Sequence, residues 1–412
     1  MKIRKKYLFY ALAFSSAIIV ALNSGIDVIA KSYIDDPWAL GMSCFIAGVI
    51  ISLLFTLLLS IPRKGKSIGS ILLDPSFQRI RFPKKKEIIY HLLSGFGNAI
   101  LTIGYFIVLS ILGDPSVVLP FGQMVILYLV VIESITEKDV PTLVEIQSSI
   151  IVTFGAILGS ISLSGSINIQ ALIIVFGVIN PGWVLLSIYQ RKLKMMKINE
   201  KTNDSINIRL WNVIFACLFT GIIVLIIDTI NGSSIFFEGI RVTIEYFHWM
   251  AVIGIGTFLS FVFYIRALGI GKASVTQAVK SSVIIFSIPV SIALSYIGLV
   301  DPITTDPVLL IIKFIGIVLM ILGIMSFALT LTKAYIFIRI NTGYPIEETM
   351  NKIWNIKGVN RVTATAGSYD YIVKIRTRTL VKGYEKIIRK LEEIDAIKEY
   401  KWESVLKEWE KI

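Results

Sequence analysis

The sequence has 412 residues, of which 55% are hydrophobic and 17% are charged, and its formal net charge is +13. In soluble globular proteins about a quarter of all residues are charged, so this composition excludes an ordinary soluble protein. It indicates an integral membrane protein.

Apolar stretches of about 20 residues, the length that crosses a bilayer core as a helix, follow one another from Tyr7 to Thr332. We therefore predict an all-α membrane domain with ten spans. They are expected near residues 7–29, 38–61, 88–110, 115–133, 142–163, 168–190, 208–230, 248–268, 274–298 and 307–331. The first stretch is too long for a signal peptide and has no clear cleavage site.

Lysine and arginine predict the orientation of these spans. With the N-terminus inside, the inner segments before residue 333 hold 21 of them, whereas the outer loops hold only Lys31 and Arg241. Basic residues favour the cytoplasmic side. We expect both termini in the cytoplasm of a prokaryotic cell, with the chain in its plasma membrane. The positive charge then reflects topology, and no nucleic-acid partner is expected.

Residues 1–332 contain a weak internal repeat, with halves near 7–163 and 168–331. The run FIVLSILGDPSVV at 106–118 aligns with YIRALGIGKASVT at 264–276, with four of thirteen positions identical. An odd number of helices in each half would insert the two copies in opposite directions. Inverted repeats of this kind are typical of transporters that open one site alternately to each face.

The ten-helix layout, the pattern Tyr264-x-x-Ala-Leu-x-x-Gly-x-Ala-Ser and the later Pro289 resemble the EamA-like drug/metabolite transporter superfamily. The resemblance implies secondary transport, often export, of amino acids or related small metabolites. The first half fits less well, since Pro120 is displaced relative to Pro289. The segment around Gly65-Lys66-Ser67 lacks the first glycine of a phosphate-binding loop, having Ser60 there. We therefore expect gradients, not ATP, to drive transport.

Polar residues inside apolar spans are candidates for the substrate site, because they are costly in lipid. Lys280 could neutralise a carboxylate, whereas Asp27 could bind substrate, pair with Lys313 or reach water. Asn180 precedes Pro181 and Gly182, which are expected to interrupt the sixth helix. The full predicted set is Asn23, Asp27, Asn98, Gln123, Asn180, Trp183, Trp211, Asn212, Tyr264, Gln277 and Lys280. For each amide or aromatic residue, helix–helix hydrogen bonding is an equal alternative.

Cys44 and Cys217 lie within apolar spans without metal-ligand spacing, so packing roles are expected. His91 and His248 are isolated. No cofactor, metal site or catalytic cluster is expected, and we do not interpret the chain as an enzyme.

The segment from Ala334 onwards changes character and predicts a cytoplasmic α+β domain over residues 334–412. Strands are expected at 334–340, 359–366, 371–376 and 397–406, with helices at 345–356 and 380–394. This β-α-β-β-α-β order is that of a ferredoxin-like fold.

The run VTATAGSYDYIVKI at 362–375 resembles the effector-binding domain of Lrp/AsnC regulators, an ACT-like domain also called RAM. The resemblance implies pairing of two such domains into dimers or larger oligomers. It also implies amino-acid binding near Gly367, Ser368, Tyr369 and Asp370. In the alternative, Gly367 and Asp370 only build the turn.

We expect an amino-acid effector to bind this domain and to bias a transporter to which it is joined by only Thr332 and Lys333. A second interpretation remains open, in which the protein is a membrane-anchored amino-acid sensor that transports nothing.

Overall fold

The computed structural model describes residues 5–63, 65–113, 118–119, 122–136, 143–159, 168–198, 201–300, 306–329, 332–356, 358–377 and 387–404. Parts of the fourth, fifth and tenth expected spans, and the first part of the expected helix 380–394, lie outside these residues. The chain divides into two compact units, the first ending at Ile324 and the second beginning at Met325, with residues 142–144 grouped with the second.

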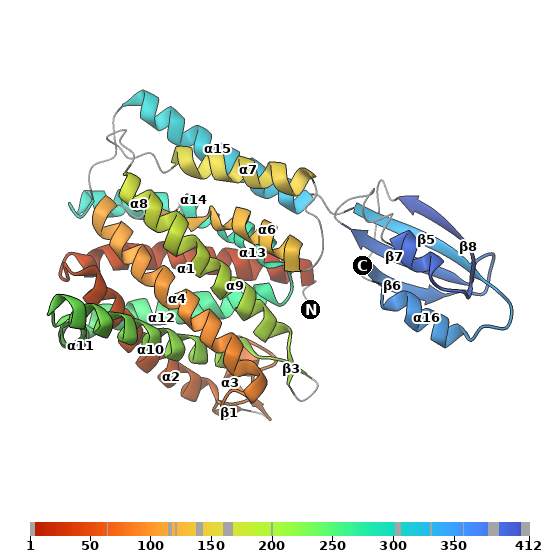
Figure 1. Ribbon diagram of the computed structural model, residues 1–412, viewed down its shortest axis with the longest axis horizontal. Helices are drawn as coiled ribbons and strands as arrows, with labels where there is room; N and C mark the ends of the chain where they lie inside the picture. The colour runs from red at the N-terminus through yellow and green to blue at the C-terminus, as the bar shows by residue number, and fades with distance from the viewer. Residues whose placement is uncertain are drawn as a thin grey trace. The chain divides into compact units, whose positions relative to one another are not determined.

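The first unit is built of helices that run roughly side by side (Figure 1). Its N-terminal part contains α1 (Lys5–Lys31), α2 (Pro37–Leu59), α3 (Ile68–Leu72), α4 (Lys85–Leu112), α6 (Val125–Thr136) and α7 (Leu143–Gly159). Its later part contains α8 (Ile169–Ile174), η1 (Val175–Ile179), α9 (Asn180–Met195), α10 (Ser205–Asn231), α11 (Ile235–Glu245), α12 (Phe247–Leu268), α13 (Ala273–Lys280), α14 (Val283–Tyr296) and α15 (Pro307–Leu329), of which the residues from Met325 are grouped with the second unit. Helical segments therefore occur at every position where the sequence predicts a span.

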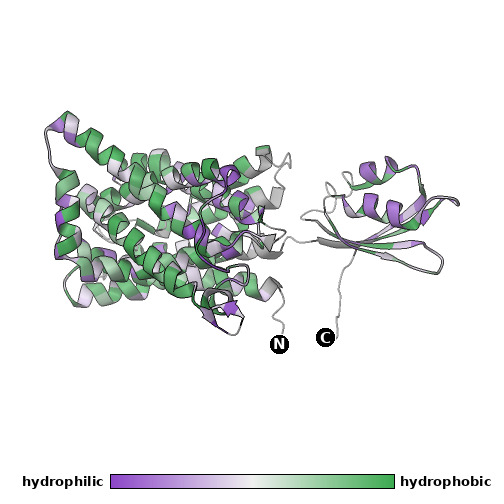
Figure 2. Cartoon of the chain, turned by 90° about the horizontal axis from the view of Figure 1, so that it is seen from below, coloured by the Kyte–Doolittle hydropathy of each residue, from purple (hydrophilic) through white to green (hydrophobic). Residues whose placement is uncertain are grey.

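Seven helical stretches among the described residues are long and apolar enough to cross a membrane: Tyr7–Lys31, Pro37–Leu59, Lys85–Leu112, Ile169–Met195, Ser205–Asn231, Phe247–Leu268 and Ala273–Tyr296. The apolar segments Ile146–Gly155 and Pro307–Gly323 are shorter. Figure 2 shows hydrophobic residues along these helices and hydrophilic residues mainly towards their ends. The chain is thus a multi-pass membrane protein, while the number ten remains a prediction.

Local chemistry explains where several helices begin and end. Oδ1 of Asp36 accepts hydrogen bonds from the backbone N–H groups of Trp38 and Ala39, and Pro37 occupies the first turn of α2. These are standard signals for a helix start. Gly232 ends α10 in the left-handed conformation, with φ of 65°, which glycine adopts without steric cost.

The sixth expected span is not interrupted at Asn180, and that expectation was wrong. The five-residue π-helical segment η1 directly precedes α9, so the helical path continues through Pro181. A π-helical turn changes the local hydrogen-bond pattern and accommodates a proline that lacks an N–H group. The break occurs instead in the ninth span, where α13 ends at Lys280 and α14 begins at Val283.

Two short hairpins connect helices at one end of the unit: β1 (Pro62–Arg63) with β2 (Lys66–Ser67), and β3 (Lys197–Ile198) with β4 (Lys201–Thr202). Helix α11, which the sequence analysis did not anticipate, lies at the opposite end (Figure 1).

The second unit is a four-stranded antiparallel sheet with the strand order β6-β7-β5-β8. Its strands are β5 (Thr332–Ile340), β6 (Val359–Ala364), β7 (Tyr371–Thr377) and β8 (Ile397–Ser404), and α16 (Ile346–Trp354) and a helix over 387–392 complete the described part. One face of the sheet buries Ile336, Ile338, Val373 and Ile375 against Ile353 and Leu391 of the helices. The alternating pattern of residues in the sequence predicted these strands, and in the structure the apolar residues of the pattern lie on the buried face.

Candidate functional site

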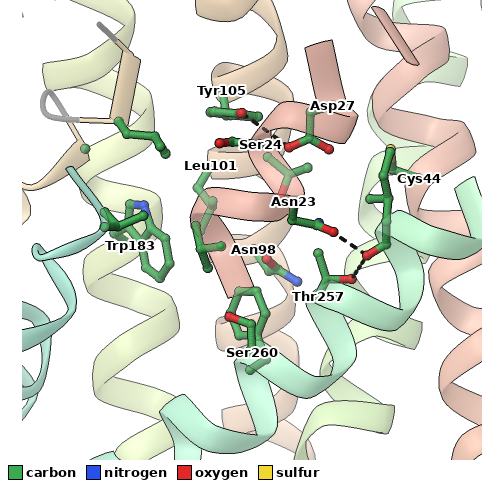
Figure 3. Close-up of a pocket in the computed structure, with 18 of the residues that line it drawn as sticks. Asn23, Ser24, Asp27, Cys44, Asn98, Leu101, Tyr105, Trp183, Thr257 and Ser260 are labelled. Carbon is green, nitrogen blue, oxygen red and sulfur yellow. Dashed lines mark hydrogen bonds between the residues drawn. The ribbon is translucent and has the colours of Figure 1, made fainter. Parts of the chain in front are cut away.

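A cavity of about 160 Å³ lies inside the first unit. It is comparable to the roughly 150 Å³ apolar cavity that holds one benzene molecule, so it has room for a small metabolite. Helices α1, α2, α4, η1, α9, α10, α12, α13 and α14 contribute to its wall, together with Val118, Leu119, Gly122 and Gln123. Figure 3 shows side chains from several of these helices converging on it. Its polar and aromatic wall residues include Asn23, Ser24, Asp27, Cys44, Asn98, Thr102, Tyr105, Gln123, Trp183, Arg209, Thr257, Ser260, Phe261 and Lys280.

Asp27 supplies the negative group of the cavity wall. Its side chain is only 8% exposed, and Oδ2 accepts a hydrogen bond of 3.3 Å from the hydroxyl of Tyr105 (Figure 3). Oδ1 of Asp27 has no hydrogen-bond partner among the described residues. A buried carboxylate oxygen without a partner is unfavourable unless a ligand or water satisfies it.

Lys280 supplies a positive group at the break between α13 and α14. Its ammonium lies 4.1 Å from the ring centroid of Trp183, 4.5 Å from that of Tyr264 and 5.5 Å from that of Phe261. Three aromatic faces attract a cation through their negative π-systems. They hold Lys280 in place, but they do not neutralise its charge.

Arg209 is a second buried cation in the same wall. It is 3% exposed, and its guanidinium carbon lies 4.4 Å from the centroid of the Phe261 ring. Nη1 of Arg209 donates to Oδ1 of Asn212, which also accepts from Nδ2 of Asn98. Lys280 and Arg209 therefore both contact the ring of Phe261.

The structure brings together six of the predicted substrate-site residues in the cavity wall: Asn23, Asp27, Asn98, Gln123, Trp183 and Lys280. Three others support wall residues. Asn212 accepts from Asn98, Nε2 of Gln277 donates to Oε1 of Gln123 over 3.0 Å, and the ring of Tyr264 faces Lys280.

Two predicted residues lie elsewhere. Asn180 is fully buried, does not line the cavity, and has no side-chain hydrogen bond among the described residues. Nε1 of Trp211 donates to the backbone oxygen of Arg81, outside the cavity.

The sequence analysis missed Arg209, Tyr105, Phe261, Thr257 and Ser260 as wall residues, and it assigned Cys44 to packing alone. Arg209 was counted with the basic residues that set topology. Arg209 lies one turn inside α10, whereas a basic residue that only sets orientation can lie before the helix begins. That position is the signal that distinguishes Arg209 from the other basic residues.

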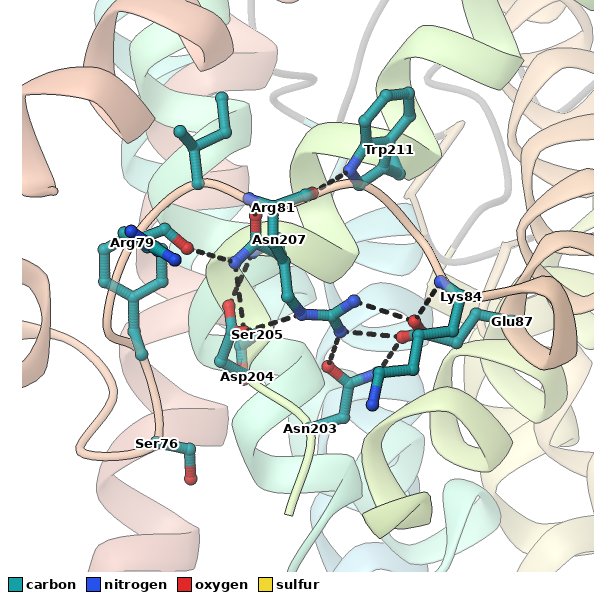
Figure 4. Close-up of polar contacts among 12 residues, drawn as sticks. Ser76, Arg79, Arg81, Lys84, Glu87, Asn203, Asp204, Ser205, Asn207 and Trp211 are labelled. Atoms are coloured by element: carbon teal, nitrogen blue, oxygen red, sulfur yellow. Dashed lines mark hydrogen bonds and ion pairs between the residues drawn. The ribbon is translucent and has the colours of Figure 1, made fainter. Parts of the chain in front are cut away.

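A separate polar network, which we call the loop network, joins the segment before α4 to the segment before α10 (Figure 4). Arg81 forms a bidentate ion pair with Glu87, in which Nη1 donates to Oε2 over 2.7 Å and Nη2 donates to Oε1 over 2.8 Å. Arg81 also donates to Oδ1 of Asn203, and Asn203 donates in turn to Glu87. Nδ2 of Asn207 donates to the backbone oxygen of Arg79. These contacts hold two loops together at the hairpin end of the helices.

Asp74 extends the loop network. Lys194 donates to Oδ2 of Asp74 over 2.7 Å, as does the backbone N–H of Ser205 over 2.8 Å. Burial raises the pKa of Asp74, but the Lys194 ammonium and these hydrogen bonds outweigh it, so the pKa lies below its usual range. Burial raises the pKa of Asp204. These groups serve as structural contacts between the loops.

In the second unit, the predicted effector residues lie in the turn between β6 and β7. Gly367 and Ser368 are exposed, and Tyr369 and Asp370 are half-buried. Oδ2 of Asp370 accepts from the backbone N–H of Ile340 over 2.8 Å. Arg339 donates to the backbone oxygen of Ser368, and its guanidinium lies 5.2 Å from the ring centroid of Tyr369.

The φ of Gly367 is not positive, and a Cβ atom there would meet no neighbour within 4 Å, so the turn does not require glycine at this position. The hydrogen bond to Asp370 shows that this carboxylate does build the turn, while no hydrogen bond to its second oxygen is found among the described residues.

Residues 333–411 match the family described as the Lrp/AsnC ligand binding domain. This match identifies the second unit and suggests regulation through binding of an amino acid. No curated protein matches the chain. A solved structure titled "Crystal structure of protein" is 14% identical and covers 77% of this chain and 95% of its own, with a TM-score of 0.46. That likeness is too weak to support an argument about function.

Proposed function

We propose that this protein is a secondary transporter, acting as an exporter, of amino acids or related small metabolites. In this proposal ten membrane-spanning helices form two inverted five-helix halves, as the resemblance to EamA-like transporters implies, and they expose one site alternately to each side. The proposal involves no catalytic step and no cofactor. Both termini are placed in the cytoplasm of a prokaryotic cell.

One observation carries the proposal: a cavity in the membrane unit is lined by Asp27, Arg209 and Lys280, all nearly fully buried. Ionisable groups at membrane depth are unfavourable, and they usually mark a pathway for a substrate or ion. Helices of both proposed halves form the wall, with α1 and α4 from the first, and α10 and α12 from the second. A site shared by both halves is the one whose access changes when the halves move against each other.

The second unit adds regulation to the proposal. An amino acid bound near Tyr369 and Asp370 would bias the equilibrium between inward-open and outward-open states, provided its affinity differs between them. Pairing of the sheets of two chains would make the protein a homodimer or a larger oligomer.

Uptake of labelled amino acids by proteoliposomes that contain the purified full chain tests transport. We expect flux above that of empty liposomes, and we expect Lys280→Ala to abolish it while membrane insertion persists. Lys197→Ala, at an exposed position of β3, is the matched control and should retain flux. Wild-type flux in Lys280→Ala would remove this residue from the site.

A membrane-anchored sensor is the alternative. Flux that never exceeds empty liposomes for any amino acid would favour it. Removal of residues 335–412 separates regulation from transport, because the truncated chain should keep its flux and lose its response to added amino acids. A response that survives the truncation would contradict the regulatory role of this unit.

A further inference from the structure

The charges of the cavity wall are divided between two ends. Arg209 and Lys280 both contact the ring of Phe261, at 4.4 and 5.5 Å from its centroid. Among the residues that the structure describes, neither cation forms an ion pair with a carboxylate, and Nε of Arg209 has no hydrogen-bond partner. Two buried cations that contact one ring repel each other, so the arrangement favours an anionic ligand at this end of the cavity.

The opposite end of the cavity carries one carboxylate. Asp27 is bound by the Tyr105 hydroxyl, and its other oxygen is buried without a partner among the described residues. Tyr105 donates one neutral hydrogen bond, which leaves the charge of an ionised Asp27 uncompensated. This end therefore favours a cationic group such as an ammonium.

The distance between the two ends of the cavity can be estimated along helix α4. Asn98 shares the acceptor Asn212 with Arg209, so Asn98 marks the level of the cationic end. Tyr105, which binds Asp27, follows Asn98 by seven residues in the same helix. At a rise of 1.5 Å per residue, the two levels are about 10 Å apart.

Helix α1 gives a second estimate of the distance between the two ends. The hydroxyls of Ser16 and Ser260 lie 3.1 Å apart, and Ser260 precedes Phe261, the ring that Arg209 covers. Asp27 follows Ser16 by eleven residues in α1, a rise of about 16 Å. The two measures together place the opposite charges roughly 10 to 16 Å apart along the helices.

An ordinary α-amino acid is too short to bridge this distance. Its carboxylate carbon and α-nitrogen are two bonds apart, about 2.5 Å with bonds near 1.5 Å, and a hydrogen bond adds about 3 Å at each end. In lysine, six bonds in a zigzag separate the carboxylate carbon from the side-chain nitrogen, about 7 Å. With one hydrogen bond at each end, extended lysine spans about 13 Å.

We infer that the cargo is an elongated zwitterion of the lysine type, with its carboxylate at the end of the cavity that holds Arg209 and Lys280 and its distal ammonium at Asp27. This inference rests on the proposed transport function and names its substrate class. The aromatic residues Trp183 and Tyr264 act as positioning residues, since they hold the Lys280 ammonium and do not themselves pair with the carboxylate.

The test compares three molecules of similar length in proteoliposomes containing the full chain. Lysine carries both charged ends, norleucine lacks the distal amine, and 1,5-diaminopentane lacks the carboxylate. The wild-type protein should take up lysine at least about tenfold better than either analogue, because a site built for a polar group strongly rejects a ligand that lacks it. Asp27→Asn should remove the preference for lysine over norleucine, and Lys280→Gln the preference over 1,5-diaminopentane.

Norleucine flux in Asp27→Asn also shows that this variant is folded and active. Asp35→Asn, an exposed acid between α1 and α2, is the matched control and should keep the wild-type preference. Equal uptake of alanine and lysine by the wild-type protein, or an equal loss of lysine and norleucine flux in Asp27→Asn, would overturn the inference while leaving transport intact. No flux of any compound would overturn the proposed function itself, and the inference with it.

Discussion

The ammonium of Lys194 lies 2.7 Å from Oδ2 of Asp74, although the two residues are 120 positions apart in the chain. Lys194 also donates to the backbone oxygen of Asn203, and Asp74 accepts from the N–H of Ser205. This ion pair therefore fixes the end of α9 and the start of α10 to the loop before α4. Both partners are largely buried, so neither can turn to water when the other is removed.

Replacement of Lys194 by methionine should strongly destabilise the helical unit. Removing one partner of a buried ion pair leaves an uncompensated charge and costs about 3–5 kcal/mol. Thermal unfolding of the detergent-purified chain measures the effect. Lys352→Met removes an exposed ion pair with Glu348, and it serves as a control that should leave the unfolding temperature unchanged. Equal unfolding temperatures for the two variants would contradict the prediction.

The same pair predicts the direction of a pH effect. The folded pKa of Asp74 lies below its ordinary value of 3.8, so the folded state binds the proton more weakly than the unfolded state. The stabilisation is fully present above that ordinary value and is lost as the pH falls through the folded pKa. Unfolding temperatures measured down a pH series should fall more steeply at the acid end for wild type than for Asp74→Asn. Parallel curves would show that Asp74 does not contribute.

The loop network also predicts that a cross-link between its two loops will block transport. The hydroxyls of Ser76, which follows α3, and Thr202, in β4, lie 3.0 Å apart, so cysteine side chains placed at both positions are expected to form a disulfide on oxidation. If this end must open during alternating access, oxidation of the Ser76→Cys, Thr202→Cys double variant should stop flux. A reducing agent should restore it. Each single variant should be insensitive to oxidation, and full flux in the cross-linked protein would show that these loops need not separate.

Helix positions could be predicted from the sequence because the length of an apolar stretch is a property of the chain itself. The position of the helix break could not be predicted from the sequence, because it depends on tertiary contacts. Pro181 is accommodated by the π-helical segment before it, whereas the turn at Ser281 and Ser282 has no proline to announce it. Likewise, Gly182 looked like a helix breaker, but it serves close packing against α4.

This packing leads to a prediction about α4 and α9. A Cβ atom on Gly97 would lie 2.7 Å from the backbone oxygen of Gly182, and one on Gly182 would lie 2.8 Å from that of Gly97. Backbone atoms cannot move aside easily, so Gly97→Ala should cost about 1–3 kcal/mol through overpacking. Gly177→Ala is the matched control, since a Cβ there meets nothing within 4 Å. Thermal unfolding should separate the two variants, and equal stability would contradict this packing.

The candidate site was predictable only in part, for a related reason. Asp27 and Lys280 were found because a charge inside an apolar stretch is visible in the sequence. Arg209 was hidden because a basic residue near the start of a helix is also the ordinary signal of membrane orientation. Trp211 was included because an apolar helix gives no sign of which face meets a cavity.

The last prediction concerns Asp370, whose carboxylate both builds its turn and is expected to bind an effector ammonium. Asp370→Asn keeps an acceptor oxygen for the N–H of Ile340, so the sheet should remain folded. It removes the negative charge, so an amino-acid effector should bind at least about tenfold more weakly, since charge-assisted hydrogen bonds are about twice as strong as neutral ones. Asp370→Ala removes the hydrogen bond as well and should cost about a further 1 kcal/mol in stability.

Thermal stabilisation of the full chain by each amino acid measures effector binding in these variants. Asp395→Asn changes an exposed acid of the same unit, and it should bind the effector as the wild type does. If Asp370→Asn also binds normally, the carboxylate serves only the turn between β6 and β7. The effector would then have to be held by other groups near Tyr369, such as the Arg339 guanidinium, which lies 5.2 Å from the centroid of that ring.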